Sequence, residues 1–191
     1  MEFPKNHIIG WPKGNLIVGE ALEAQVGLVL RQHDLKLAVA ESCTGGLIGH
    51  LLTNVPGSSD YYLGGIIAYS YEAKERLLGV KHTTLLTYGA VSQETVIEMA
   101  RGVRAVFSPD FPIGKIIGLS VSGISGPGGG MPGKPVGLVW IGLSTAGLDR
   151  AYQFVWNGDR LKNKQLSAEM ALQLLIDYLQ VEQKEDEEQH G

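Results

Sequence analysis

Residues 41–46, Glu-Ser-Cys-Thr-Gly-Gly, hold the strongest candidate for chemistry in this 191-residue chain. Ser42 and Cys43 are both nucleophile types, and the two glycines that follow permit a tight turn. Where such a turn opens a helix, free backbone N–H groups point at the same spot. A nucleophile beside these donors is the arrangement that acyl transfer needs. The candidate donors of an oxyanion hole are Thr44, Gly45 and Gly46.

Each nucleophile candidate also has a simpler explanation. Serine is a common helix N-cap, so Ser42 could merely cap the helix that begins near Gly45. A lone cysteine is usually a small buried hydrophobe, and this interpretation is favoured for Cys43. Ser42 is therefore the leading nucleophile, with the cap left open as the alternative.

Tyr69 and Lys74 form the second candidate pair. Tyr69 ends a strand expected over residues 61–69, and Lys74 lies early in the helix that follows. Both can reach the crevice of Ser42 if the two strands are neighbours. A lysine shielded from water has a lowered pKa and can act as a general base. The alternative is a solvated lysine that pairs with a nearby glutamate.

Two further segments could bind an anionic ligand. The loop 122–130 holds five glycines, among them Gly123 and Gly126, whose N–H groups could cradle a phosphate. Its spacing fits neither the Walker loop nor the dinucleotide fingerprint, and a structural turn explains it equally well. Arg160 could clamp a carboxylate or a phosphate, or be an ordinary surface arginine.

The overall composition narrows the classes of protein. The net charge is −4 and no basic stripe is visible, so nucleic-acid binding has little electrostatic support. No segment approaches the ~20 apolar residues of a membrane helix, and residues 1–14 do not resemble a signal peptide. The single cysteine excludes an internal disulfide. We therefore expect a soluble, cytoplasmic protein.

The histidines and the cysteine do not suggest a metal site. The five histidines are scattered, none forms an H-x-x-x-H motif, and there is no C-x-x-C motif. We therefore expect neither a metal nor a cofactor.

Strands and helices alternate along the chain and predict one domain. Strands are expected at 35–40, 61–69, 115–121, 136–144 and 151–156, and helices at 19–33, 45–54, 72–78, 92–107 and 161–179. A short turn at 146–147 joins the last two strands, so the sheet should be mixed. The expected fold is a three-layer α/β/α domain at 19–180, between an irregular arm at 1–18 and an acidic disordered tail at 181–191.

Five blocks resemble, in order, the motifs of the CinA C-terminal domain family. The blocks are AESCTGG at 40–46, YSYEAK at 69–74 with LGV at 78–80, GAVS at 89–92, SGISGPGG at 122–129 with KPVG at 134–137, and GDR at 158–160. The resemblance runs from about Gly19 to Leu179, nearly the whole chain.

The resemblance implies a specific activity. Members of this family are nicotinamide mononucleotide (NMN) amidases, which release nicotinate mononucleotide and ammonia and so recycle a product of NAD consumption. It also implies the α/β/α fold, with Ser42 as nucleophile and Lys74 and Tyr69 as its activators. Which of the two is the proximal base stays open. Arg160 would contact the nucleotide, and the glycine loops would donate N–H groups to the phosphate or the oxyanion.

Two functions of other classes stay open. A non-catalytic nucleotide-binding module would keep the glycine loops and Arg160 but would have no use for Ser42. A competence or recombination accessory protein would act through contacts, although the composition does not support DNA binding. The sequence does not fix an oligomeric state, and a homo-oligomer stays open.

Overall fold

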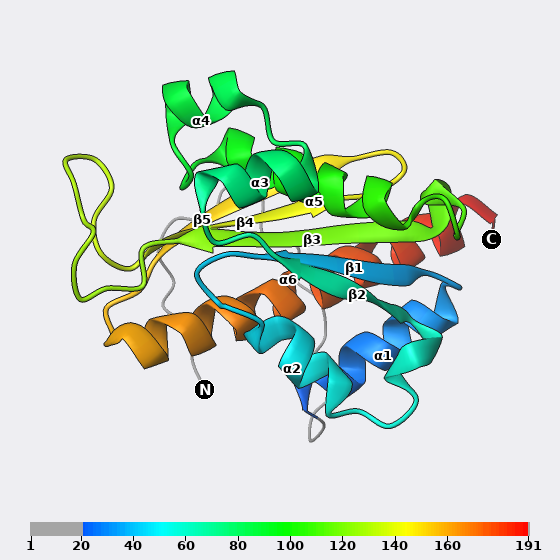
Figure 1. Ribbon diagram of the computed structural model, residues 1–191. Helices are drawn as coiled ribbons and strands as arrows, with labels where there is room; N and C mark the ends of the chain where they lie inside the picture. Colours follow the sequence, from blue (N-terminus) through cyan, green and yellow to red (C-terminus); the bar gives the residue numbers. More distant parts are fainter. Residues whose placement is uncertain (1–20, 191) are drawn as a thin grey trace.

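The computed structural model describes residues 21–190, and side chains up to residue 180. A five-stranded sheet lies between two layers of helices (Figure 1). The strands are β1 (Lys36–Glu41), β2 (Tyr62–Ile67), β3 (Ile116–Gly123), β4 (Leu138–Ser144) and β5 (Asp149–Val155). The α-helices are α1 (Leu22–Gln32), α2 (Leu47–Thr53), α3 (Tyr71–Leu78), α4 (His82–Tyr88), α5 (Gln93–Phe107) and α6 (Arg160–His190).

The strand order is β2-β1-β3-β4-β5. Strand β1 runs parallel to both β2 and β3, whereas β4 is antiparallel to β3 and β5. The mixed sheet and the α/β/α architecture are thereby confirmed. Because β1, β2 and β3 are parallel, their carboxyl ends meet at one edge, where ligands collect in open α/β sheets.

The central strand shows how the sequence produces the layers. Helices α1, α2 and α6 cover one face of the sheet, and α3, α4 and α5 cover the other (Figure 1). Side chains of a strand alternate between faces. Accordingly Leu37 and Val39 of β1 belong to the larger hydrophobic core, and Ala38 and Ala40 to the smaller one. A strand buried on both faces reads as the continuous apolar run seen in the sequence.

Glycines let α5 lie close to the sheet. A Cβ on Gly118 of β3 would meet the backbone oxygen of Ala100 at 2.0 Å, and one on Gly142 of β4 would meet that of Val96 at 2.6 Å. Larger residues at these two positions would push the helix away. This close contact fixes α5 on the face that also carries α3.

Three segments differ from the sequence-based expectation or escape it. Helix α4 was not predicted, because only Thr84 and Leu85 of its seven residues are buried and no apolar stripe marks it. Helix α6 continues to His190 in place of a disordered tail from residue 181, in a segment rich in the helix formers Glu, Lys and Gln. The irregular arm expected at residues 1–18 lies outside the described residues. None of the described helices has the length and apolar composition needed to cross a membrane.

Candidate active site

The ends of the parallel strands bring the first two candidates together. Glu41, the last residue of β1, pairs with Ile67 of β2 on one side and Val121 of β3 on the other. The next backbone amides continue these ladders, because Ser42 N–H donates to Val121 O at 3.0 Å and Ala68 N–H donates to Glu41 O at 2.8 Å. The segments after β1 and β2 therefore leave the sheet side by side.

Lys74 contacts Ser42 directly. Its Nζ lies 2.9 Å from Ser42 Oγ and 2.8 Å from the carbonyl oxygen of Ala68, to which it donates. Ser70 caps α3 by accepting the Ala73 N–H, and this fixes the turn that carries the lysine. Lys74 is 1% exposed, so the alternative of a solvated helix lysine is wrong.

Burial decides the protonation of this lysine. Loss of water around Nζ lowers the pKa of Lys74 from 10.5 to about 8. Among the described residues no carboxylate forms an ion pair with Lys74. A sizeable share of the amine is thus neutral near pH 7–8 and can accept a proton from the hydroxyl of Ser42.

Glu41, not Ser42, caps the following helix. The buried carboxylate of Glu41 accepts the N–H groups of Gly46 at 2.9 Å, Ile48 at 3.2 Å and Gly49 at 2.9 Å. A negative charge at this position stabilises the start of α2. The cap interpretation of Ser42 is therefore wrong. Sequence reasoning missed Glu41, because it lies five residues before the N-cap Gly46 and only the folded turn brings its carboxylate to the helix start.

The same cap changes the expected oxyanion hole. The Gly46 N–H is taken by Glu41, and the Gly45 N–H donates to Ser42 O at 3.1 Å within the turn. Two of the three expected donors are therefore already used. Thr44 is the remaining one, and its N–H donates to no other described residue. Its hydroxyl is also buried and unpartnered among the described residues.

Cys43 is a buried core residue, as favoured from the sequence. Its side chain belongs to the larger hydrophobic core and is 6% exposed. Burial raises the pKa of the Cys43 thiol to about 12, so the reactive thiolate is not populated at neutral pH.

Tyr69 and Arg160 are hydrogen-bonded to each other. The Tyr69 hydroxyl accepts from Arg160 Nη2 at 3.0 Å, and Arg160 Nη1 donates to Gly126 O at 2.8 Å. No hydrogen bond among the described residues joins Tyr69 to Ser42 or to Lys74. Tyr69 is 60% exposed. This group forms a polar rim that ties the end of β2 to the glycine-rich loop.

The two loop glycines take other places than expected. Gly123 is the last residue of β3 and pairs with Val139, so it belongs to the sheet. Gly126 adopts φ +90°, which favours glycine, and contributes its carbonyl oxygen to Arg160. The expectation that both present N–H groups to a ligand therefore has no support in these contacts.

Asn163 is a buried polar residue that sequence reasoning missed. Its Nδ2 donates to Ser125 O at 3.1 Å and Gly158 O at 2.9 Å, and its Oδ1 accepts from Gly158 N–H at 2.9 Å. It thereby ties the start of α6 to the loop 122–130. Nothing in the helical spacing of 160–179 singles it out. Within the described part of the chain, no three His, Cys, Asp or Glu side chains gather as a metal site would need.

Comparisons with known proteins agree with the motifs. The family described as CinA C-terminal domain matches residues 19–179. A CinA-like protein of Desulfosudis oleivorans is 50% identical over 158 residues, which are 82% of this chain and 37% of that protein. A CinA-like protein of Salinibacter ruber is 46% identical over 163 residues, 84% of this chain and 38% of its own length. The chain thus spans about two-fifths of the length of the curated relatives it matches.

Solved structures show the same fold. The competence damage-inducible protein A (ComA) of Klebsiella pneumoniae superposes with a TM-score of 0.77 at 33% identity, covering 83% of this chain and 94% of that one. The competence or damage-inducible protein of Enterobacter asburiae gives 0.76 at 32% identity, covering 83% and 96%. With the motifs in order and the fold shared, the chain belongs to the CinA C-terminal domain family.

Proposed function

We propose that this protein hydrolyses the carboxamide of NMN to nicotinate mononucleotide and ammonia, with Ser42 as nucleophile and Lys74 as general base. The observation that carries the reaction class is the buried 2.9 Å contact between Lys74 Nζ and Ser42 Oγ. The choice of NMN rests on the motif resemblance to the family.

The first half of the reaction forms an acyl-enzyme. Neutral Lys74 takes the proton of Ser42 while Oγ attacks the carboxamide carbon. Of the three expected backbone donors, the Thr44 N–H is the one left for the oxyanion. The C–N bond then breaks, and protonated Lys74 gives its proton to the leaving nitrogen, which departs as ammonia. The carbonyl oxygen of Ala68 holds the ammonium group between these two proton transfers.

The second half returns the enzyme to its starting state. Lys74 takes a proton from water as the water oxygen attacks the ester carbon. The bond to Ser42 Oγ breaks, and Oγ recovers its proton from Lys74. The product is the carboxylic acid, so water supplies the oxygen that replaces the amide nitrogen.

A purely binding role makes no use of this pair. Burying an amine without a carboxylate costs free energy that a binding module or an accessory protein would not recover. Perturbed groups of this kind cluster at functional sites. We therefore favour catalysis over the two non-catalytic alternatives.

Ammonia release from NMN tests the proposal. Ser42→Ala should lower the rate by about 10³-fold or more, because removing an activated nucleophile abolishes the covalent route. Cys43→Ala is the matched control, and it should keep most of the activity since that thiol lies in the core. A Ser42→Ala enzyme that keeps more than roughly a tenth of the rate would remove Ser42 from this role.

A further inference from the structure

The loop 122–130 is attached to the start of α6 at two successive carbonyl groups. The carbonyl oxygen of Ser125 accepts from Asn163 Nδ2 at 3.1 Å. The carbonyl oxygen of Gly126 accepts from Arg160 Nη1 at 2.8 Å. Asn163 is 1% exposed, whereas Arg160 is an exposed residue. The attachment made by Asn163 is therefore the one protected from competition by water.

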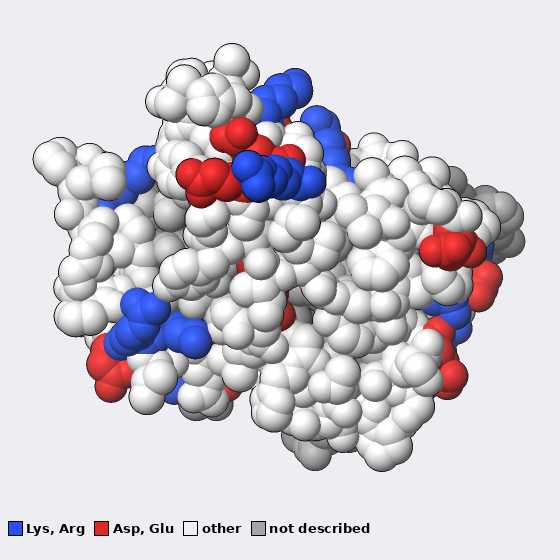
Figure 2. All heavy atoms as spheres, in the orientation of Figure 1, with Lys and Arg blue, Asp and Glu red and all other residues white. Residues whose placement is uncertain are grey.

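The amide of Asn163 joins the loop to a further segment. Its Nδ2 also donates to Gly158 O at 2.9 Å, and its Oδ1 accepts the Gly158 N–H at 2.9 Å. Figure 2 shows Lys and Arg side chains gathered over the beginning of α6, whereas Asn163 itself is buried. One buried side chain thus connects the segment after β5, the start of α6 and the loop after β3.

Ser125 in turn contacts the residue next to the proposed nucleophile. Its side chain forms a hydrogen bond with the thiol of Cys43, and the two residues are 8% and 6% exposed. Cys43 directly follows Ser42, whose N–H donates to Val121 O of β3 at 3.0 Å. The loop after β3 is therefore packed against the turn that follows β1.

The opposite side of this turn has a separate anchor. The carboxylate of Glu41 accepts the N–H groups of Gly46, Ile48 and Gly49. These bonds fix the start of α2 and do not involve residues 42–43. The place of the nucleophile therefore depends also on the loop that is packed against the turn.

We propose that Asn163 is a positioning residue, which holds the loop 122–130 against the turn of Ser42 and so keeps the nucleophile beside its base. The inference rests on the proposed function for the role of Ser42. None of the hydrogen bonds of the Asn163 side chain among the described residues reaches Ser42 or Lys74, so it acts through the loop. A nucleophile misplaced by about 1 Å can lose about 10²-fold in rate.

The single cysteine of the chain provides a readout that needs no turnover. Burial raises the pKa of the Cys43 thiol to about 12, so the parent should react slowly with the disulfide reagent DTNB. Asn163→Leu keeps the approximate size of the side chain and deletes its three hydrogen bonds. The loop should then separate from the turn, and Cys43 should react roughly tenfold faster or more, because water and reagent reach the thiol.

Ser167→Ala is the matched control, one turn later on the same helix. The buried Ser167 Oγ accepts from Trp156 Nε1 at 2.9 Å and donates to Asn163 O at 2.7 Å, so neither bond involves the loop 122–130. This variant should also lower the unfolding temperature, because it leaves a buried N–H without a partner. Its thiol should nevertheless react at close to the parent rate. Equal acceleration in the two variants would indicate general loosening and would overturn the positioning role.

Asn163→Asp separates the two attachments and keeps the test decisive if Asn163→Leu does not fold. An aspartate keeps an acceptor for the Gly158 N–H but has no donor for Ser125 O at neutral pH. Its Cys43 thiol should therefore also react roughly tenfold faster or more than that of the parent. Reaction at the parent rate would show that the loop does not need this bond, and would overturn the proposal.

Kinetics on NMN then connect the loop with the chemistry. Asn163→Leu should lower kcat roughly tenfold or more with a smaller change in KM, because a misplaced nucleophile slows the chemical step. Ser167→Ala should keep its kcat. A faster thiol reaction with an unchanged kcat would overturn the positioning role. If the parent releases no ammonia from NMN, the amidase proposal fails, whereas the thiol measurements still decide whether Asn163 holds the loop.

Discussion

Two cations are buried at opposite ends of this sheet, and they are used differently. Lys74 lies where β1 and β2 end, and Arg104 of α5 lies where β3 begins. Arg104 donates from Nε to Ile116 O at 2.8 Å and from Nη2 to Ile113 O at 2.8 Å. Burial lowers the pKa of both side chains, yet a guanidinium stays charged at any working pH. Lys74, with a pKa of about 8, can lose its proton.

The partners of each cation explain its role. The planar guanidinium of Arg104 donates hydrogen bonds to backbone carbonyl oxygens and to Ser144 Oγ at 3.0 Å, so it joins α5 to the sheet. Lys74 has a hydroxyl as its partner instead, and a hydroxyl can become a nucleophile. Burial alone therefore does not mark a catalytic cation; a reactive neighbour does.

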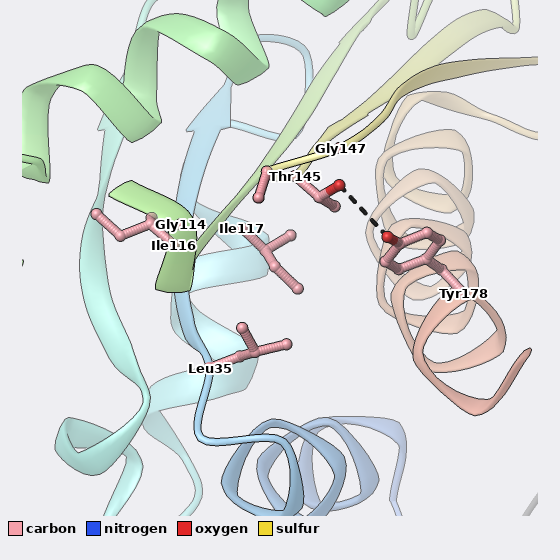
Figure 3. A pocket seen from close by; sticks show the side chains of 8 residues that line it. Leu35, Gly114, Ile116, Ile117, Thr145, Gly147 and Tyr178 are labelled. Carbon is pink, nitrogen blue, oxygen red and sulfur yellow. Dashed lines mark hydrogen bonds between the residues drawn. The ribbon is translucent and has the colours of Figure 1, made fainter. Parts of the chain in front are cut away.

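The hollow near Arg104 supports this distinction. It measures about 110 Å³ and is lined mainly by apolar or small residues such as Leu35 and Ile117. Tyr178 points its hydroxyl at Thr145 Oγ1, 3.3 Å away (Figure 3). The polar groups seen here are held by one another and face no nucleophile. A cavity at this end lacks the chemistry found at the other.

Replacing Lys74 should have the largest effect on activity. Lys74→Met keeps the length of the stem without the amine, and Lys74→Arg keeps a charge that cannot be released. Both should lower kcat/KM for NMN by about 10³-fold or more, because no base remains beside Ser42. In the parent, kcat/KM should rise with pH through about 8 and then level off, since only the neutral amine accepts the proton. Steady-state ammonia assays over pH 6–10 measure both effects.

An active arginine variant would erase the contrast between the two cations. If Lys74→Arg works about as well as the parent, Lys74 acts as a fixed positive charge, as Arg104 does. Some other group would then have to deprotonate Ser42. A Lys74→Met variant that keeps the rate would show instead that neither the amine nor its charge is needed.

Replacing Arg104 should affect stability rather than chemistry. Arg104→Met removes the buried hydrogen bonds to Ile116 O and Ser144 Oγ, which should cost about 3 kcal/mol of unfolding free energy. Arg101→Met is the matched control on the same helix. Its side chain is 60% exposed and pairs with Asp149, so the cost should stay under about 1 kcal/mol.

Urea unfolding measures both arginine variants, and ammonia release at permissive temperature checks the site. Equal losses of stability would show that Ile116 O and Ser144 Oγ do not need Arg104. A lower kcat in a folded Arg104→Met variant would show that the two ends of the sheet are coupled. The contacts described above do not link them.

The sequence predicted those features that depend on local pattern. The apolar run before residues 41–46 predicted the central strand. Helix starts also follow local pattern, since Ser70 and Ser92, a residue type preferred at N-caps, accept the N–H of Ala73 and Thr95. The contact between Lys74 and Ser42 followed only if two strands were neighbours, a condition that the topology meets.

The features that escaped prediction depend on tertiary neighbours. Asn163 looks like any polar residue of a helix until the loop carrying Ser125 is placed against it. Similarly, the N–H groups of Gly45 and Gly46 look free in the sequence, and only the fold shows that Ser42 O and Glu41 use them. Sequence spacing indicates which groups can lie close together, but not which hydrogen-bond partner each group has.

Asp177 allows the comparison to be extended to a buried acid. It is 2% exposed in α6, its Oδ1 accepts from Gln173 Nε2 at 2.8 Å, and Oδ2 has no partner among the described residues. Burial raises the pKa of Asp177 to about 6, above its unfolded value. The folded state therefore binds the proton more tightly, and stability should fall as pH rises from about 4 to 6.

Asp177→Asn should remove this penalty. We expect a gain of about 1–2 kcal/mol at pH 7 and little change at pH 4, where the carboxyl is protonated. Glu169→Gln is the control, since Glu169 accepts the same kind of bond from Gln165 and is less buried than Asp177, and it should change stability little at either pH. Urea unfolding at the two pH values measures the free energy of unfolding of each variant. If Asp177→Asn raises it equally at both, the ionised carboxylate of Asp177 does not destabilise the fold.

Tyr69→Phe should have the smallest effect, and it tests the division of work within the active site itself. The motifs suggest Tyr69 as an activator of Ser42, whereas its hydroxyl accepts from Arg160 and the side chain is 60% exposed. An exposed hydroxyl that is hydrogen-bonded to Arg160 should not take the proton of the buried Ser42 hydroxyl. We expect kcat on NMN to change less than about threefold, which is under 1 kcal/mol, and the pH limb near 8 to stay in place.

Tyr71→Phe is the control for this last variant, because Tyr71 OH accepts the Ala90 N–H on the neighbouring loop and has no contact with Arg160. A rise in KM confined to Tyr69→Phe would mean that the rim formed with Arg160 holds the substrate. A hundredfold loss of kcat, or a displaced pH limb, would instead make Tyr69 a proton relay. Lys74 would then share the chemistry with an exposed group, and contact with Ser42 would no longer be enough to identify the residue that moves its proton.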